Sequence, residues 1–147
     1  MKTLRFLAVG ALILTTPFAL AGCSSEKKDA RAVAVTLGDF VIRTKTNSVP
    51  AGAVTFKIKN AGGLEHEMVV FKVDAISDIP TKADGEADEE GVNESLHMGE
   101  IAHIKASQSK TWKVTLPAGK YVLLCNLNEG GHVHYQKGMH TTFTVTA

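Results

Sequence analysis

Hydrophobic and polar residues alternate with a period of two along most of the chain from residue 32 onward. In the segment VTFKIKN, Val54, Phe56 and Ile58 alternate with polar residues, and the segments TWKVTL and TTFTV repeat the pattern. Such alternation is typical of antiparallel strands that bury one face. It predicts about eight strands, near residues 32–37, 40–46, 54–59, 66–73, 100–106, 110–116, 120–125 and 141–146.

Turn-forming residues separate these runs at short intervals. The segments SVPAG, NAGG and LPAGK each combine proline or glycine with small residues directly before or after a predicted strand. Short strands with frequent turns favour a β-sandwich or barrel, and the length of 147 residues suits one such domain. We therefore predict an all-β domain over residues 32–147.

One long segment, residues 74–99, interrupts the alternation and is rich in aspartate and glutamate. We expect a solvated acidic insertion, in which a short helix around residues 86–96 is possible. A calcium loop is a weaker interpretation, because DGEADEEG lacks the ligand spacing and closing glutamate of a helix-loop-helix site. A docking surface is a further alternative.

The N-terminal residues have the pattern of an export signal. Lys2 and Arg5 precede an apolar run over residues 6–20, which is too short and too poorly flanked to span a membrane. The following LAGC resembles the lipobox of bacterial lipoproteins, in which the cysteine is lipidated. We expect a signal peptide over residues 1–22, lipidation of Cys23 and a polar tether over residues 23–31, with an ordinary cleaved signal as the alternative.

Charge and cysteine content narrow the function classes. Loss of residues 1–22, with Lys2 and Arg5, reduces the 16 basic residues to 14 against 15 acidic ones, a formal charge of −1. No basic patch argues for nucleic acid. If Cys23 carries lipid, Cys125 has no disulfide partner in an oxidising compartment, which suggests that another group uses its thiol.

Metal-binding side chains are concentrated between the last two predicted strands. Cys125 ends one strand, His132 and His134 follow, and Met139 precedes the other strand. Thiolate, imidazole and thioether ligands together favour copper, because magnesium and calcium prefer oxygen and zinc rarely binds methionine. A trigonal copper site needs a second imidazole, and His66 in NAGGLEHEMVVF supplies it at the start of another strand.

These segments resemble those of the cupredoxins, the small blue copper domains of the plastocyanin and azurin type. The resemblance covers roughly residues 34–147 and rests on NAGGLEHEMVV, LPAGKYVLLCN and HYQKGM followed by TTFTV. It implies a Greek-key β-sandwich with one mononuclear type 1 copper site, whose ligands are His66, Cys125, His134 and Met139. It further implies a one-electron carrier rather than an enzyme, with redox proteins of the cell envelope as partners.

The chain departs from the family pattern in the loop after the cysteine. Eight residues separate Cys125 from His134, whereas only a few do so in plastocyanin and azurin. The extra residues include His132, which is therefore an alternative to His134; the spacing to Met139 favours His134, and Gly130 with Gly131 suggests a bulge. The remaining candidates, His97, Met98, His103 and His140, are expected to be surface or strand residues.

The sequence also leaves other functions open. A long flexible loop with an additional histidine suits a copper-binding lipoprotein that buffers or delivers the metal without carrying electrons. A structural domain without metal, or with zinc on Cys125 and a loop histidine, is a further alternative. We expect a membrane-tethered monomeric electron carrier in the cell envelope, with its loop imidazole at the solvent and His66 buried.

Overall fold

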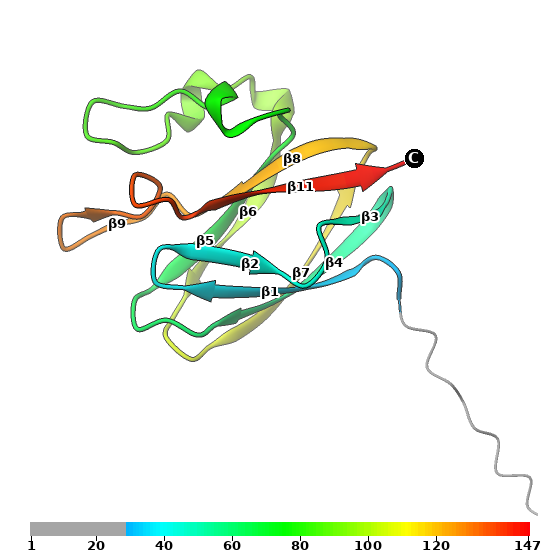
Figure 1. The fold of residues 1–147 in the computed structure, drawn as a ribbon, viewed down its shortest axis with the longest axis horizontal. Coiled ribbons are helices and arrows are strands. Elements are labelled where there is room, and N and C mark those ends of the chain that lie inside the picture. Colours follow the sequence, from blue (N-terminus) through cyan, green and yellow to red (C-terminus); the bar gives the residue numbers. More distant parts are fainter. Residues whose placement is uncertain (1–28) are drawn as a thin grey trace, which may run out of the picture.

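The computed structural model describes residues 29–147 as two β-sheets that face each other, with long connections gathered at one end (Figure 1). No helix in this part of the chain is both long and apolar enough to cross a membrane. The expected signal peptide, the lipidation of Cys23 and most of the tether lie outside the described residues.

The first sheet has the strand order β2-β1-β4-β7. Its strands are β1 (Ala32–Gly38), β2 (Val41–Thr44), β4 (Gly52–Asn60) and β7 (Ser109–Leu116). Strands β1 and β4 run parallel, and the other neighbours are antiparallel. Only Asp39 and Phe40 separate β1 from β2, which places this tight turn at the end of the sheet.

The second sheet has the order β3-β11-β8-β5-β6. Its strands are β3 (Ser48–Pro50), β11 (His140–Thr146), β8 (Gly119–Leu124), β5 (His66–Phe71) and β6 (His97–Ile104). Strand β8 is antiparallel to both β11 and β5. The C-terminal end of β8 therefore lies beside the starts of β5 and β11, at one end of the strands of this sheet.

The space between the sheets is filled by the residues that the alternation assigned to the buried face. Val54, Phe56 and Ile58 of β4 face Phe143 and Val145 of β11 in one apolar core, and each is at most 2% exposed. Full burial of such side chains contributes about 1.5–3 kcal/mol each. The predicted all-β sandwich is confirmed, and each of the eight predicted strands corresponds to one in the structure.

The acidic insertion is not simply solvated, as we had expected. Its apolar residues Ile79, Ala87 and Val92 are buried in a second cluster against the outer face of the second sheet, which includes Phe71 and Leu124. Figure 1 shows the insertion covering β8 and β11. Because both faces of β5 are covered, every residue of that strand is buried.

The possible helix around residues 86–96 is replaced by two single turns of 3-10 helix, η2 (Glu89–Gly91) and η3 (Glu94–Leu96), after an earlier turn η1 (Ile76–Asp78). Asp88 and Asn93 precede η2 and η3, and their side chains accept hydrogen bonds from the backbone within these turns. These caps fix short turns without a continuous helical hydrogen-bond ladder.

Candidate metal centre

Three strand ends carry the candidate ligands. His66 is the first residue of β5, Cys125 directly follows β8, and Met139 directly precedes β11. Val69 pairs with Leu124, and Leu124 also pairs with His140. The antiparallel register therefore brings His66, Cys125 and Met139 to the same end of the sheet. His66, Cys125 and Met139 are far apart in the sequence, and the pairing of their strands brings them together.

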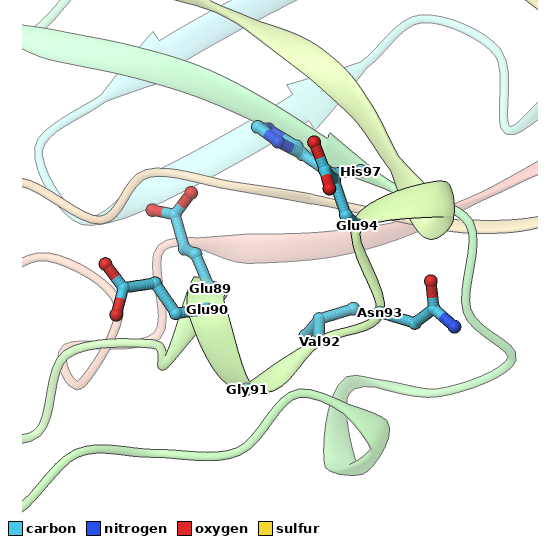
Figure 2. Close-up of a pocket in the computed structure, with 7 residues that line it drawn as sticks. All are labelled: Glu89, Glu90, Gly91, Val92, Asn93, Glu94 and His97. Carbon is cyan, nitrogen blue, oxygen red and sulfur yellow. The ribbon is translucent and has the colours of Figure 1, made fainter.

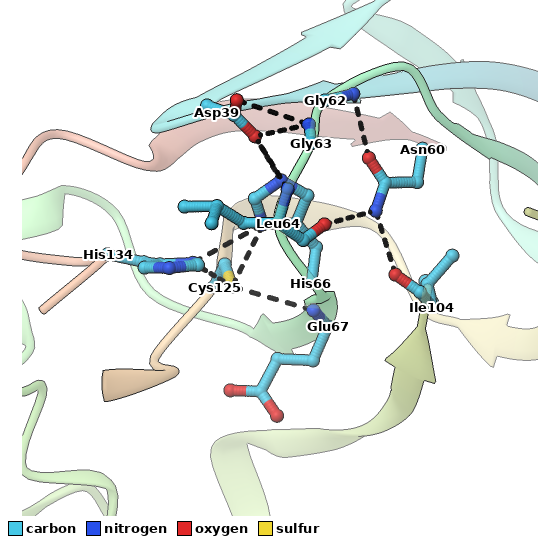
Figure 3. A network of polar contacts seen from close by, with 10 residues as sticks. All are labelled: Asp39, Asn60, Gly62, Gly63, Leu64, His66, Glu67, Ile104, Cys125 and His134. Atoms are coloured by element: carbon cyan, nitrogen blue, oxygen red, sulfur yellow. Dashed lines mark hydrogen bonds and ion pairs between the residues drawn. The ribbon is translucent and has the colours of Figure 1, made fainter. Parts of the chain in front are cut away.

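The three nitrogen and sulfur donors lie close enough to share one ion. The Nδ1 atoms of His66 and His134 are 3.3 Å apart, and Cys125 Sγ lies 3.3 Å from Nδ1 of His134 and 4.0 Å from Nδ1 of His66. All three side chains are fully buried. The structure therefore gathers a thiol and two imidazole nitrogens into one pocket closed to solvent (Figure 3).

The backbone holds Met139 in register with the other loop residues. The amide of Cys125 donates to the Met139 carbonyl, and the Met139 amide donates to the His134 carbonyl, each over 3.0 Å. Met139 is fully buried in the core cluster that also contains Cys125. The thioether is thus available on the interior side of the loop.

The extra residues of the long loop form a small hairpin. Strands β9 (Asn128–Glu129) and β10 (His132–Val133) pair through Gly130 and Gly131, which adopt φ values of +59° and +79°. Two consecutive residues with positive φ give the tight turn that matches strand twist. The predicted bulge is a short hairpin that returns the chain to His134.

The hairpin also separates the two candidate loop histidines. Val133 is buried, His134 turns inward to Cys125, and His132 is exposed and outside the donor cluster. The alternative of His132 in place of His134 is therefore not the arrangement of the structure.

Burial controls the protonation of the cysteine. Desolvation raises the pKa of the Cys125 thiol to about 11, against the smaller opposing effect of backbone amides at Glu67 and Leu127. The Glu67 amide lies 3.5 Å from Sγ and donates to it. Without metal the Cys125 side chain is a thiol at neutral pH. A bound cation would stabilise the thiolate, and the Glu67 amide is oriented to donate a hydrogen bond to it.

Burial likewise lowers the pKa values of both imidazoles. For His66 the carboxylate of Asp39 opposes this effect, and for His134 repulsion from His66 adds to it. Neutral imidazoles are the form that binds metals. The Nε2 atoms of both rings are buried, and neither makes a hydrogen bond within residues 29–147.

The loop imidazole does not reach the solvent, which corrects our expectation. The half-buried ring of Phe40 packs edge to face on His134, with ring centroids 5.3 Å apart, and also lies 6.0 Å from the ring of His132. Phe40 has a φ of +63°, which is uncommon for a residue with a bulky side chain. The turn between β1 and β2 thus places an aromatic ring against both His134 and the exposed His132.

A network of polar contacts fixes the segment before His66 (Figure 3). The buried Asn60 amide group donates to the carbonyls of Leu64 and Ile104 and accepts from the Gly62 amide. Asp39 accepts hydrogen bonds from the amides of Gly63 and Leu64, which lower its pKa and keep it ionised. The approach of the chain to His66 is thereby tied to both sheets.

A second set of contacts joins the insertion to the centre. The Asn126 amide group exchanges hydrogen bonds with the backbone of Ala87 in both directions and donates to Glu89. The Asn126 backbone amide donates to Glu67, whose own pKa is raised by burial. The residue after Cys125 therefore anchors the insertion at the edge of the site.

The other histidines lie outside the centre, as expected. His103 is exposed and contacts Glu65 at 2.8 Å, and His140 packs on Tyr135. His97 stacks on Phe71 at the margin of an acidic pocket, which Figure 2 shows lined by Glu89, Glu90, Gly91, Val92, Asn93, Glu94 and His97. Donor atoms of His97, Glu89 and Glu100 also lie close together.

The buried donor set fits a single type 1 copper site. Two imidazoles and a cysteine match the trigonal ligands of such sites, and a nearby methionine matches the weak axial ligand. The Nδ1 atom of each ring faces the sulfur, at 4.0 Å for His66 and 3.3 Å for His134, which is the orientation that ligation needs.

Solved structures share this architecture. An auracyanin from the photosynthetic bacterium Roseiflexus castenholzii matches with a TM-score of 0.59 and 23% identity over 80% of this chain and 98% of its own. The chain has the cupredoxin fold. An azurin from Methylomonas sp. strain J gives 0.55 and 17%, over 79% and 98%, and the blue copper protein auracyanin A from Chloroflexus aurantiacus gives 0.50 and 17%, over 78% and 99%. Neither a family model nor a curated sequence matches.

Sequence reasoning missed the residues that surround the donors in this cupredoxin fold. Asp39 and Phe40 form a two-residue turn far from the ligands in the sequence, and no spacing rule connects them to His66 or His134. The sequence analysis also did not identify Asn60 and Asn126, although each directly follows a predicted strand and lies near a segment that carries a ligand. An asparagine directly after a predicted strand was the one feature of the sequence that could have indicated these two residues.

Proposed function

We propose that the protein is a blue copper electron carrier with His66, Cys125, His134 and Met139 as the ligands of one copper ion. The observation that carries the proposal is the convergence of Cys125 Sγ and two Nδ1 atoms within 4.0 Å in a fully buried pocket. Copper held there would supply one-electron chemistry between its two common oxidation states.

The surrounding residues favour electron transfer with little rearrangement. His66 and Cys125 are rooted in neighbouring strands, and the backbone hydrogen bonds of Met139 hold the remaining loop. The Glu67 amide stabilises the thiolate, and burial excludes water and oxidants from the sulfur. A rigid, dry site lowers the reorganisation that each electron transfer would require.

We infer that the carrier is tethered to a membrane of the cell envelope by lipid on Cys23 and exchanges electrons there with redox proteins as a monomer. The lipobox LAGC and the export signal before it support this placement. The polar residues 24–31 would then form the tether.

Copper buffering or delivery is less well supported than electron transfer. That alternative depended on a long flexible loop. The loop is instead ordered by the β9–β10 hairpin and by the burial of Val133. His134 is fully buried behind Phe40, which disfavours rapid exchange of metal with an acceptor protein.

Addition of Cu(II) tests the proposal through the charge-transfer band of a copper thiolate. We expect an intense absorption near about 600 nm that is lost in Cys125→Ser and in His134→Ala and retained in His132→Ala. A colourless copper complex of the unaltered protein would contradict it. Slow Cu(I) release to a chelator, with fast reversible reduction, distinguishes a carrier from a delivery protein.

A further inference from the structure

The outward nitrogen of His66 faces a carboxylate. Nε2 of His66 is buried and lies 3.4 Å from Oδ1 of Asp39, slightly beyond the usual length of an N–H···O hydrogen bond. The opposite nitrogen, Nδ1, faces Cys125 and His134. Ligation through Nδ1 requires that Nε2 carry the proton, and a buried N–H needs an acceptor.

Asp39 is itself held in place. Its Oδ1 accepts from the amides of Gly63 and Leu64 over 3.0 and 3.2 Å, and its Oδ2 lies 3.2 Å from the Gly63 amide. The carboxylate side of the pair therefore has little freedom, and a movement of a few tenths of an ångström in the imidazole would complete the hydrogen bond. The side chain of Asp39 is 43% exposed, whereas that of His66 is fully buried.

We propose that Asp39 is a positioning residue that accepts the Nε2 proton of His66, fixes its tautomer and orientation, and makes the centre favour Cu(II) over Cu(I). This inference rests on the proposed copper function. An outer carboxylate increases the basicity of a metal-bound imidazole, and such partners commonly change metal affinity by about 10–100-fold. A nearby negative charge stabilises the more highly charged oxidation state.

Asp39→Asn separates this role from a structural one. Asparagine keeps one oxygen that can accept from the Gly63 and Leu64 amides, removes the negative charge and replaces the second oxygen with an NH2 group. We expect the ratio of Cu(II) to Cu(I) dissociation constants to increase about tenfold, which raises the reduction potential by about 59 mV. Asp78→Asn is the matched control, because Asp78 also accepts a backbone hydrogen bond, from Ala75, in an exposed turn.

The tautomer of His66 in the metal-free full chain provides a second readout, by nitrogen NMR of the imidazole. We expect a proton on Nε2. A proton on Nδ1 alone, or a blue Asp39→Asn protein with an unchanged potential, would overturn the inference and leave the copper proposal intact. An unaltered protein that forms no blue Cu(II) complex would instead overturn the proposed function.

Discussion

The ring of Phe40 meets the imidazole of His134 edge to face, with centroids 5.3 Å apart and planes at 88°. His134 is fully buried, and Phe40 is the half-buried residue on its outer side. In the proposed carrier the Phe40 ring would therefore cover part of His134, the ligand on the loop.

Phe40→Ala should expose the edge of His134 and accelerate reduction of the copper-loaded protein by a small reductant severalfold. Alanine retains a Cβ at the same positive φ, so the change removes the ring without relieving the backbone. Stopped-flow measurement of the loss of blue colour reports the rate. Phe40→Leu, which keeps an apolar cover, should react at nearly the original rate; equal rates for all three proteins would contradict the shielding role.

The β9–β10 hairpin depends on the backbone freedom of Gly131. Its φ of +79° is unfavourable for residues with a Cβ, although no atom lies within 4 Å of the place that a Cβ would occupy. Gly131→Ala should therefore destabilise the protein by about 1 kcal/mol through backbone conformation alone. Urea unfolding measures this cost, and Gly131→Asn should lose less because asparagine tolerates the left-handed region; a larger loss in the asparagine variant would refute the explanation.

The fold followed from the sequence because one physical signal dominates it. Residues such as Val54, Phe56 and Ile58 must all face one side of a strand, and a shift by one residue would turn them all to water. The same logic located the ends of the strands that carry His66 and Cys125. These predictions depend on local periodicity, which a single sequence contains.

The surroundings of the donors depend instead on contacts between distant segments. Nothing in the local sequence indicates that Phe40 covers His134, so the expectation of a solvent-facing loop imidazole was wrong. The acidic segment was predicted from its charges, whereas its structure is decided by a few apolar residues, including Ile79 and Ala87, that cover the second sheet. Scattered apolar positions in a charged segment carry no periodic signal.

Burial of Cys125 predicts a loss of stability in alkaline solution for the metal-free protein. Its thiol pKa is raised from 9.0 to about 11 by desolvation. Well below pH 9.0 the thiol is protonated in both folded and unfolded chains, so its contribution is fully present. As the pH rises toward 11 the unfolded chain ionises first, and stability falls by at most about 1.4 kcal/mol per pH unit.

Urea unfolding of the metal-free protein and of Cys125→Ala, across this alkaline range, isolates the contribution of the thiol. Other groups titrate there in both proteins, so the informative quantity is the difference between their free energies of unfolding. We expect that the advantage of the unaltered protein over the variant shrinks as the pH rises. A difference that is independent of pH would show that the folded protein accommodates the thiolate without cost.

The side chain of Asn126 makes three hydrogen bonds to the insertion, two with Ala87 and one with Glu89, at distances of 2.7–3.0 Å. The same residue directly follows Cys125, so the attachment of the insertion and the position of the cysteine are linked through one peptide unit. The exposed Asn128 makes a single bond of 3.2 Å to Glu86 in the same segment.

Asn126→Ala should therefore cost about 1–3 kcal/mol of stability, because it leaves partly buried backbone groups of Ala87 without partners. The loss should be accompanied by faster amide hydrogen exchange at Ala87, which donates to Asn126 in the unaltered protein. Asn128→Ala is the matched control. It should lower the free energy of unfolding by no more than about 0.5 kcal/mol and leave the exchange rate at Ala87 nearly unchanged. If both variants behave alike, the insertion is held by its apolar residues Ile79 and Val92 rather than by the asparagine that follows the cysteine.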